Sequence, residues 1–298
     1  MHTSTRTADE SMPPDPSEVN VRDEPGVEID RMTSFIETTV DVADANGVVI
    51  NLSGGLDSTV TAALAVEALG PERVYGLILP CNKIGALHAR DAEGIAEALA
   101  IEHDTVHLQP LLGQFGTVAP DRFELHDEPI LTGNAIARLR MTLAYLAANA
   151  TGRLVCGTTN RSERLLGYVT KYGDGAADLL PIGHLYKTEV RSLAEALEVP
   201  EFVVDKPPSA GFLPGQRDAD DLGVPYEVID PVFRLAVDEG VDDGTITTDP
   251  DPETIASRVD IDVDPDVVER LLDRYRSTAH KRSPPPIPTE RGSTRDGK

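Results

Sequence analysis

A short loop between an apolar strand and an apolar helix constrains this chain more than any other feature. Residues 47–52 (GVVINL) form an apolar run between turn residues, which indicates a buried strand, and residues 58–69 (STVTAALAVEAL) indicate a buried helix that stops at Gly70. The connecting residues 53–58 (SGGLDS) contain two glycines, which let the backbone turn sharply and approach a ligand. Because the first N–H groups of a helix are unpaired and carry partial positive charge, this glycine loop predicts an anion-binding site.

Strand and helix signals alternate along the chain. This order predicts parallel strands joined by helical crossovers, and hence an α/β fold with a doubly wound, mostly parallel sheet flanked by helices, of the Rossmann-like type. In such folds ligands bind outside the carboxyl ends of the strands, which is where the glycine loop begins. The further predicted strands are 73–79, 102–108 and 153–156, and the further predicted helices are 30–45, 86–100, 132–150 and 266–278.

The glycine loop differs from the two common phosphate-binding loops. It lacks the Lys of GxxxxGK[ST] and the spacing of GxGxxG. Asp57 instead offers a hard oxygen ligand for Mg²⁺, which suits a magnesium-bound pyrophosphate that leaves after attack at the α-phosphate of ATP. The alternative is an ordinary strand-to-helix turn in which Asp57 and Ser58 cap the helix.

Several separated segments carry a resemblance to one enzyme family. Residues 53–58 resemble the SGGxDS signature of the ATP pyrophosphatase (PP-loop) enzymes, which adenylate a substrate and release pyrophosphate. Further segments narrow the resemblance to ammonia-dependent NAD synthetase, and this implies the adenine nucleotide alpha hydrolase-like form of the fold. These segments lie in the family's order between residues 30 and 284: 134–141 (NAIARLRM), 157–163 (GTTNRSE), 170–181 (TKYGDGAADLLP), 208–210 (PSA) and 280–282 (HKR).

The resemblance implies a two-step reaction and a role for each matched residue. The nicotinate carboxylate of deamido-NAD attacks the α-phosphorus of ATP to give an acyl-adenylate and pyrophosphate, and ammonia then displaces AMP to give NAD. The implied ATP contacts are Ser53, Gly54, Gly55, Leu56, Asp57, Ser58, Thr158, Lys187 and Ser209, with Mg²⁺ on Asp57 and Glu163. The implied deamido-NAD contacts are Arg138, Lys171, Asp178, His280 and Lys281. The implied catalytic residues are Asp57, Lys187 and Asp178, the last as a candidate proton acceptor for ammonium.

Some of these residues have a plain structural alternative. Arg138 and Arg140 are two positions apart and do not share a helix face, so we expect one of them to point into the site. The resemblance favours Arg138, and Arg140 is then a solvated helix arginine. Thr158 is also a candidate helix cap, and the pair 280–281 is also a favourable basic end for the preceding helix.

Charge limits the expected partners. The chain has 27 basic and 51 acidic side chains, a net charge of −24, which repels nucleic acids and anionic membranes, so neither is expected to bind. Lysine occurs six times while aspartate is abundant, and we interpret this as a halophilic surface, with an ordinary soluble acidic surface as the alternative. The few cations should therefore form a local positive pocket for two anionic substrates.

Composition also predicts one domain between two tails. Residues 1–25 and 283–298 are polar and contain proline, which predicts flexible tails around a domain at 26–282, and the acidic stretch 238–266 is expected at the surface. The sequence has no apolar run long enough to span a membrane. Two cysteines without a CxxC pair favour a reducing compartment, so we expect a cytoplasmic protein.

The nitrogen donor and the oligomeric state follow from the resemblance. A glutamine-dependent enzyme needs a further amidase domain, for which the two short tails leave no room, so free ammonia is the expected donor. The family is dimeric, and the amphipathic helix 30–45 is a candidate for the homodimer interface. Two rivals are a tRNA-modifying PP-loop enzyme, which the acidic charge and absent CxxC disfavour, and a non-catalytic nucleotide sensor.

Overall fold

The computed structural model describes residues 24–288 apart from 82, 124, 126, 210, 212–214, 239–240, 243–244 and 247–250. No helix in these described ranges is long and apolar enough to cross a membrane. Most of both predicted tails, and part of the acidic stretch 238–266, lie outside the described residues. The first helix, α1 (Pro25–Val42), begins one residue before the expected start of the domain.

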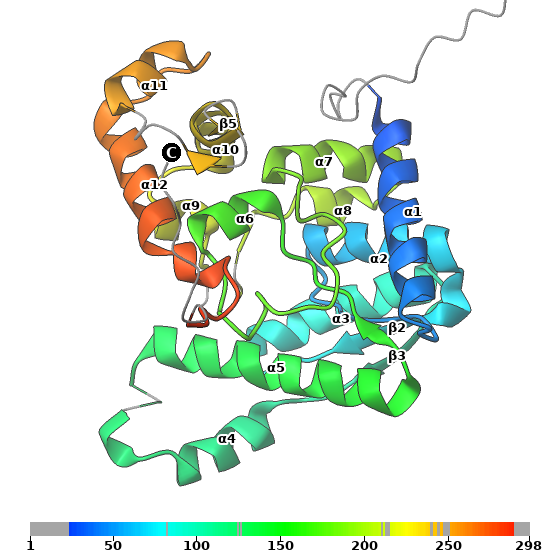
Figure 1. Cartoon of the computed structure of the whole chain (residues 1–298). Coiled ribbons are helices and arrows are strands. Elements are labelled where there is room, and N and C mark those ends of the chain that lie inside the picture. Colours follow the sequence, from blue (N-terminus) through cyan, green and yellow to red (C-terminus); the bar gives the residue numbers. More distant parts are fainter. Residues whose placement is uncertain are drawn as a thin grey trace, which may run out of the picture.

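Four parallel strands form the central sheet in the order β3–β2–β1–β4 (Figure 1). They are β1 (Val48–Asn51), β2 (Val74–Ile78), β3 (Glu102–Thr105) and β4 (Leu154–Val155), so the predicted strand 102–108 ends early. The chain runs from β1 outwards to β3 and then crosses to β4 on the other side of β1. The predicted doubly wound parallel sheet is confirmed, and its winding direction reverses between β1 and β4, where such folds bind ligands.

Helices cover both faces of the sheet. Because side chains alternate along a strand, Val48 and Ile50 of β1 enter one apolar core and Val49 enters the other. A strand buried on both faces reads as a continuous apolar run, which explains the signal at residues 47–52. The first core is covered by α1, α2 (Leu56–Leu69), α3 (Lys83–Ala98), α7 (Lys187–Ala196) and α8 (Glu201–Val204), and the second by α4 (Gln109–Val118) and α5 (Pro129–Thr151).

A helical lobe beside the sheet has an apolar core of its own. Phe233, Ile229 and Leu272 are fully buried there. Ile255 is also buried in this core, so the expectation that the whole stretch 238–266 lies at the surface is wrong. The elements of the lobe are α6 (Arg161–Leu166), α9 (Asp218–Leu222), α10 (Tyr226–Phe233), the π-helical turn η3 (Arg234–Asp238), β5 (Val241–Asp242), β6 (Thr245–Ile246), α11 (Pro252–Arg258), α12 (Pro265–Ser277) and η4 (Ala279–Lys281).

Helix α1 does not offer its apolar face to another subunit. Its side chains Met32, Ile36 and Val40 are buried in the first core, and the helix contacts α2 and α7 of the same chain. The amphipathic pattern of residues 30–45 therefore reflects packing inside the chain. Phe35 and Val42 of α1 remain exposed, so a contact between this helix and a second subunit stays a prediction.

Candidate active site

An open cavity of about 400 Å³ lies at the carboxyl ends of β1, β2 and β4. Two walls face each other across it. We call the glycine loop, residues 53–58, the loop wall. We call the residues contributed by α7 and the helical lobe, Glu163, Tyr168, Lys187 and Asp218, the lobe wall. Every residue of the implied ATP and Mg²⁺ set lines this cavity: Ser53, Gly54, Gly55, Leu56, Asp57, Ser58, Thr158, Glu163, Lys187 and Ser209.

The loop wall is shaped by glycine conformation and by two serine hydroxyls. Gly54 has φ of 72°, and a Cβ added there would lie 2.6 Å from the His88 carbonyl oxygen. The Ser53 N–H donates to Ser58 Oγ over 3.3 Å, and the two serine hydroxyl oxygens are 3.0 Å apart. Helix α2 begins at Leu56, two residues earlier than the sequence suggested, with Gly55 as its N-cap and no side-chain cap. Asp57 and Ser58 therefore lie in the first helical turn and do not cap the helix.

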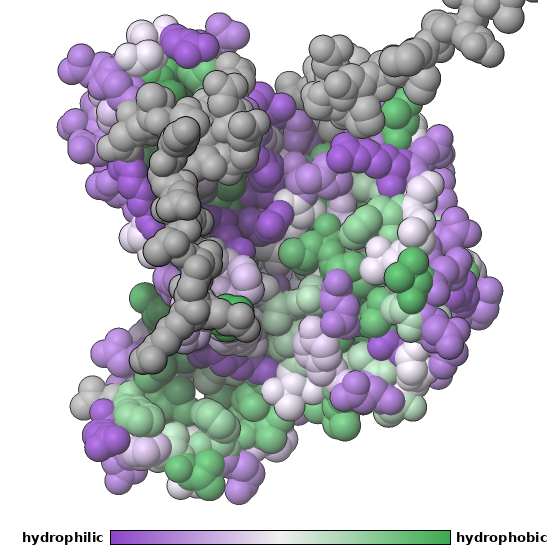
Figure 2. Space-filling view, in the orientation of Figure 1, coloured by the Kyte–Doolittle hydropathy of each residue, from purple (hydrophilic) through white to green (hydrophobic). Residues whose placement is uncertain are grey.

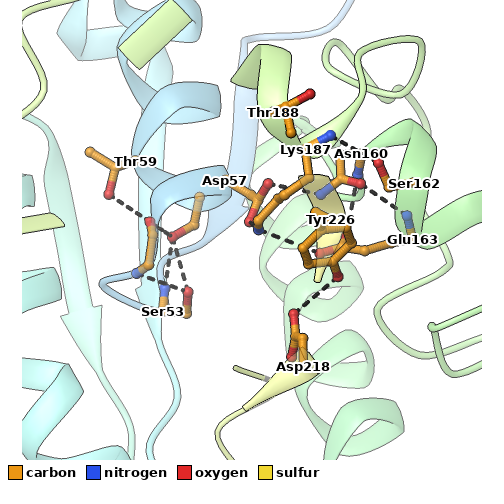
Figure 3. Close-up of polar contacts among 12 residues, drawn as sticks. Ser53, Asp57, Thr59, Asn160, Ser162, Glu163, Lys187, Thr188, Asp218 and Tyr226 are labelled. Carbon is orange, nitrogen blue, oxygen red and sulfur yellow. Dashed lines mark hydrogen bonds and ion pairs between the residues drawn. The ribbon is translucent and has the colours of Figure 1, made fainter. Parts of the chain in front are cut away.

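The lobe wall meets the loop wall through a cluster of charges (Figure 3). Lys187 Nζ donates to Asp57 Oδ2 and lies 3.7 Å from Glu163 Oε1. Asn160 Nδ2 donates to the other oxygen, Asp57 Oδ1, over 3.0 Å. One carboxylate at the start of α2 is thereby held by two elements that lie more than a hundred positions further along the chain.

Burial and mutual charge set the proton affinities of this cluster. Burial, reinforced by the nearby Asp57 carboxylate, raises the pKa of Glu163. Burial alone would lower the pKa of Lys187, but Asp57 and Glu163 outweigh it and raise that pKa, so the lysine is charged at neutral pH. A permanent cation between carboxylates can stabilise negative charge on a phosphate without any proton transfer.

Local capping explains why Glu163 lies here. Asn160 is the N-cap of α6: its Oδ1 accepts from the Glu163 N–H over 2.9 Å, and Glu163 Oε2 accepts from the Asn160 N–H over 3.3 Å. This reciprocal capping box fixes both side chains at the end of β4. The alternative role of Thr158 as a helix cap is therefore wrong. Asn160 is a fully buried partner of Asp57 that the sequence interpretation missed, although its N-x-x-E spacing is a recognisable signal.

A buried acid ties the lobe to α7. Asp230 Oδ1 accepts from the Ser162 hydroxyl over 2.6 Å, and its Oδ2 accepts from the Thr188 N–H over 2.9 Å. Ser162 Oγ in turn accepts from the Lys187 N–H over 2.9 Å. Burial raises the pKa of Asp230 to about 6. These bonds set the start of α7, and with it the position of the Lys187 backbone.

Three further residues of the cavity region were missed. Lys206 lines the cavity, and its Nζ donates to the Gly54 carbonyl oxygen over 2.8 Å and pairs with Asp91, so it holds the glycine loop in place. Asp218 is buried beside the cavity and accepts from the Tyr226 hydroxyl over 3.0 Å. No local pattern marks Asp218 or Tyr226, because the residues that give them a role come from distant parts of the chain.

The residues implied for deamido-NAD lie beside the cavity and do not line it. Arg138 is exposed, and its Nε donates to the Lys171 carbonyl oxygen over 3.3 Å. Lys171 Nζ donates to the His280 carbonyl oxygen, and Lys281 Nζ donates to the carbonyl oxygens of Gly167 and Val169, just after α6. These four residues form one continuous strip. Asp178 lies apart from this network: its Oδ2 accepts from the Val155 N–H over 2.7 Å.

Arg140 is the arginine of the α5 pair that lines the cavity. It is half-buried, and its Nε donates to the Leu79 carbonyl oxygen at the end of β2 over 3.1 Å. Burial lowers its pKa. The expectation that Arg140 is a solvated surface arginine is therefore wrong. The two-residue spacing did predict correctly that the two arginines point in different directions.

The chain is similar to known proteins over most of its length. The family model for NAD synthase matches residues 28–285. The NH(3)-dependent NAD(+) synthetase of Halobacterium salinarum is 42% identical over 259 residues, which are 87% of this chain and 91% of that protein. The structure of NMN synthetase from Francisella tularensis aligns with a TM-score of 0.74 at 34% identity, covering 89% of this chain and 98% of that one.

A second solved structure gives a similar result. The NH3-dependent NAD synthetase from Campylobacter jejuni, solved with a nitrate ion, aligns with a TM-score of 0.68 at 28% identity over 88% of this chain and 98% of that one. The range matched by the family model contains both walls of the cavity.

Proposed function

Because the chain belongs to the NAD synthase family and is a ligase, we propose that it amidates deamido-NAD with ammonia, consuming ATP and releasing AMP and pyrophosphate through an adenylated intermediate. The observation that carries this proposal is the cavity in which the glycine loop, including Asp57, faces Glu163 and Lys187 (Figure 3). A carboxylate is a poor electrophile, so an amidating enzyme must first attach a leaving group to it. Adenylation needs an anion cradle, hard oxygen ligands and a positive charge in one place, and these two walls offer all three.

ATP is placed between the two walls. The start of α2 and the backbone of Ser53 to Ser58 would hold phosphate oxygens, since helix N-termini bind anions. Thr158 and Ser209 line the same cavity and offer hydroxyls to the nucleotide. Lys187 would transfer its contact from Asp57 to the phosphates and stabilise the charge that develops on the departing pyrophosphate.

Asp57 and Glu163 fit a magnesium ion that is shared with ATP. Mg²⁺ is usually held by one or two carboxylates together with substrate phosphates. Both carboxylates approach the same lysine amine, so they lie close enough to share a cation, and no group of three metal-ligating side chains occurs among the described residues. Phosphate oxygens would therefore complete the shell. When bound, the ion would neutralise negative charge on the pyrophosphate.

Deamido-NAD is placed along the strip formed by Arg138, Lys171, His280 and Lys281. The strip lies next to Arg140, which lines the cavity, so a dinucleotide bound there can extend its carboxylate towards ATP. Asp178 stays a proposed contact and proton acceptor, although its Oδ2 already accepts a backbone N–H. Much of the strip is open to solvent, and a second subunit would cover it.

We place the homodimer interface on the exposed apolar face of α4, made of Leu111, Phe115 and Val118. These side chains are 41%, 44% and 77% exposed and recur at i, i+4 and i+7, which puts them on one helix face. Figure 2 shows apolar side chains gathered over α4. A second copy would remove this face from water. Phe115→Asp should convert a dimer into a monomer in sedimentation experiments, and an unchanged mass contradicts this placement.

The direct test uses purified protein, ATP, Mg²⁺ and deamido-NAD, with either ammonium or glutamine as nitrogen donor. We expect NAD and AMP in equal amounts with ammonium and neither product with glutamine. A nicotinate mononucleotide arm is included, because one similar structure is an NMN synthetase. Product from the mononucleotide alone would replace the proposed substrate. ATP binding without product would support a nucleotide sensor.

The two cysteines bear on the proposed cytoplasmic location. Cys81 and Cys156 are both free and buried. Disulfides are rare in the cytosol, where thiols stay reduced, so two free cysteines suit a cytoplasmic enzyme. Fractionation of the source cells would test this location.

A further inference from the structure

The lobe wall contains a buried carboxylate oxygen without a hydrogen-bond partner. Asp218 is 3% exposed and lines the cavity. Its Oδ2 accepts from the Tyr226 hydroxyl over 3.0 Å, whereas its Oδ1 is buried and has no partner among the residues that the structure describes. Buried polar atoms are nearly always paired, so an orphaned oxygen beside a substrate cavity indicates a ligand that donates hydrogen bonds.

The surroundings of Asp218 suit a cation. Lys187 Nζ lies 5.7 Å from the centre of the Tyr226 ring, so this ring already faces one ammonium group (Figure 3). The Tyr168 hydroxyl donates to Asp221 over 2.6 Å and lies near Asp218, so its single proton is already used. Lys187 is already paired with Asp57 and Glu163, so its amine does not supply the missing donor to Asp218 Oδ1.

A second cavity lies beside Asp218. This cavity of about 240 Å³ shares Lys187, Arg191 and Pro208 with the first and is lined by Tyr226 and by Ala219, the neighbour of Asp218. ATP and the nicotinate end of deamido-NAD would fill the larger cavity. Asp218 lines the first cavity and its chain neighbour Ala219 lines the second, so a ligand that enters through the second cavity would approach Asp218 from the side away from ATP.

We propose that Asp218, together with Tyr168 and Tyr226, binds the ammonium ion that supplies the amide nitrogen. This inference rests on the proposed amidation and names the site of its third substrate. The ion donates to Asp218 Oδ1 and lies against the aromatic rings, next to the charge cluster where the adenylate forms. Asp218 has an oxygen available for this task, whereas Asp178 uses Oδ2 on a backbone N–H and accepts from the Tyr145 hydroxyl over 3.3 Å at Oδ1.

The test separates ammonium binding from adenylation. Asp218→Asn keeps the size of the side chain and removes its charge, and Asp220→Asn removes one charge from the exposed side of the same helix as a matched control. The adenylation half-reaction is followed as deamido-NAD-dependent exchange of labelled pyrophosphate into ATP, which needs no ammonium. The whole reaction is followed as NAD formation over a range of ammonium concentrations.

We expect Asp218→Asn to raise the KM for ammonium at least about tenfold, the loss of one charge-assisted hydrogen bond, and to lower pyrophosphate exchange by a clearly smaller factor. Tyr226→Phe removes the hydroxyl that orients Asp218 and should raise the same KM by a smaller factor. Asp220→Asn should match wild type throughout.

Two results overturn the site. One is an unchanged ammonium KM in Asp218→Asn, and the other is a loss of pyrophosphate exchange as large as the loss of NAD formation. If Asp218→Asn does not fold, Tyr226→Phe decides by the same two readouts. Absence of exchange in the wild-type protein would instead contradict the proposed function itself.

Discussion

The two walls of the cavity are built in opposite ways. The hydrogen bonds within the loop wall join residues at most five positions apart, and its groups are hydroxyls, backbone amides and the Asp57 carboxylate. The lobe wall is made of charged side chains, and its link to Asp57 spans 130 positions. The loop wall is therefore a cradle set by local backbone geometry. The lobe wall is a charge cluster whose lysine contacts the Asp57 carboxylate of the loop wall.

The largest effect should come from removing the cation of the lobe wall. In Lys187→Met, the carboxylates of Asp57 and Glu163 lose the amine between them, and the phosphates of ATP lose a fixed positive charge. We expect kcat/KM to fall by about 10²–10³-fold, as for loss of one preorganised electrostatic contact. Lys187→Arg should retain more activity because it keeps the charge. Equal losses in both variants, measured by steady-state kinetics, would contradict a charge-based role.

The loop wall should be sensitive to added side-chain volume and not to the loss of a charge. Gly54→Ala adds a methyl group at φ of 72° and 2.6 Å from a carbonyl oxygen. We expect a loss of about 1–3 kcal/mol in the free energy of unfolding and a raised KM for ATP. Gly94 is the matched control, since a Cβ there meets nothing within 4 Å on helix α3. Gly94→Ala should gain about 0.5–1 kcal/mol in urea unfolding. If both variants unfold alike, the special geometry of the loop is contradicted.

The stability contributed by Asp230, which supports the lobe wall, should depend on pH. Burial raises the pKa of Asp230 from 3.8 to about 6, so the native state binds the proton more tightly than the unfolded chain does. The stability that the neutral acid contributes is present below pH 4 and is lost as pH rises through about 6. Relative to Asp230→Asn, the wild type should lose about 2–3 kcal/mol between these limits. Denaturant unfolding of both proteins at several pH values measures the difference, and a difference independent of pH would contradict it.

Salt should act on the surface more than on either wall. The net charge of −24 means that exposed carboxylates repel one another, and about 2 M KCl screens exposed charges almost completely. We expect the unfolding midpoint to rise with KCl in wild type and in Lys187→Met alike, because the buried cluster is screened much less than the surface. A midpoint that falls or does not move would contradict a halophilic surface. This remains a prediction from composition.

The difference between the walls also explains what the sequence could predict. Strand β1, the glycine loop and helix α2 are adjacent in the chain, and each is encoded by local periodicity and by glycine. Their order and the parallel topology could therefore be predicted, with errors confined to boundaries such as the start of α2. Ser53, Asp57, Thr158 and Glu163, which the family resemblance implied, also lie together at the cavity, because their segments follow the carboxyl ends of the adjacent strands β1 and β4.

The lobe wall could not be predicted in the same way. Asp218 and Tyr226 gain their roles from Lys187 and from each other after the helical lobe has packed, and no local spacing encodes that packing. Arg140 shows the same limit: spacing separates it from Arg138, but only the fold shows which of the two reaches the end of β2.

An oxygen-18 label tests most directly whether the nicotinate carboxylate is adenylated in this cavity. Deamido-NAD labelled with oxygen-18 in its nicotinate carboxylate is incubated with the enzyme, ATP, Mg²⁺ and ammonium, and the AMP is examined by mass spectrometry. If the carboxylate attacks the α-phosphorus in the cavity between the two walls, the AMP must carry one labelled oxygen. Unlabelled AMP, or label in free phosphate with ADP as the product, would contradict adenylation at this site.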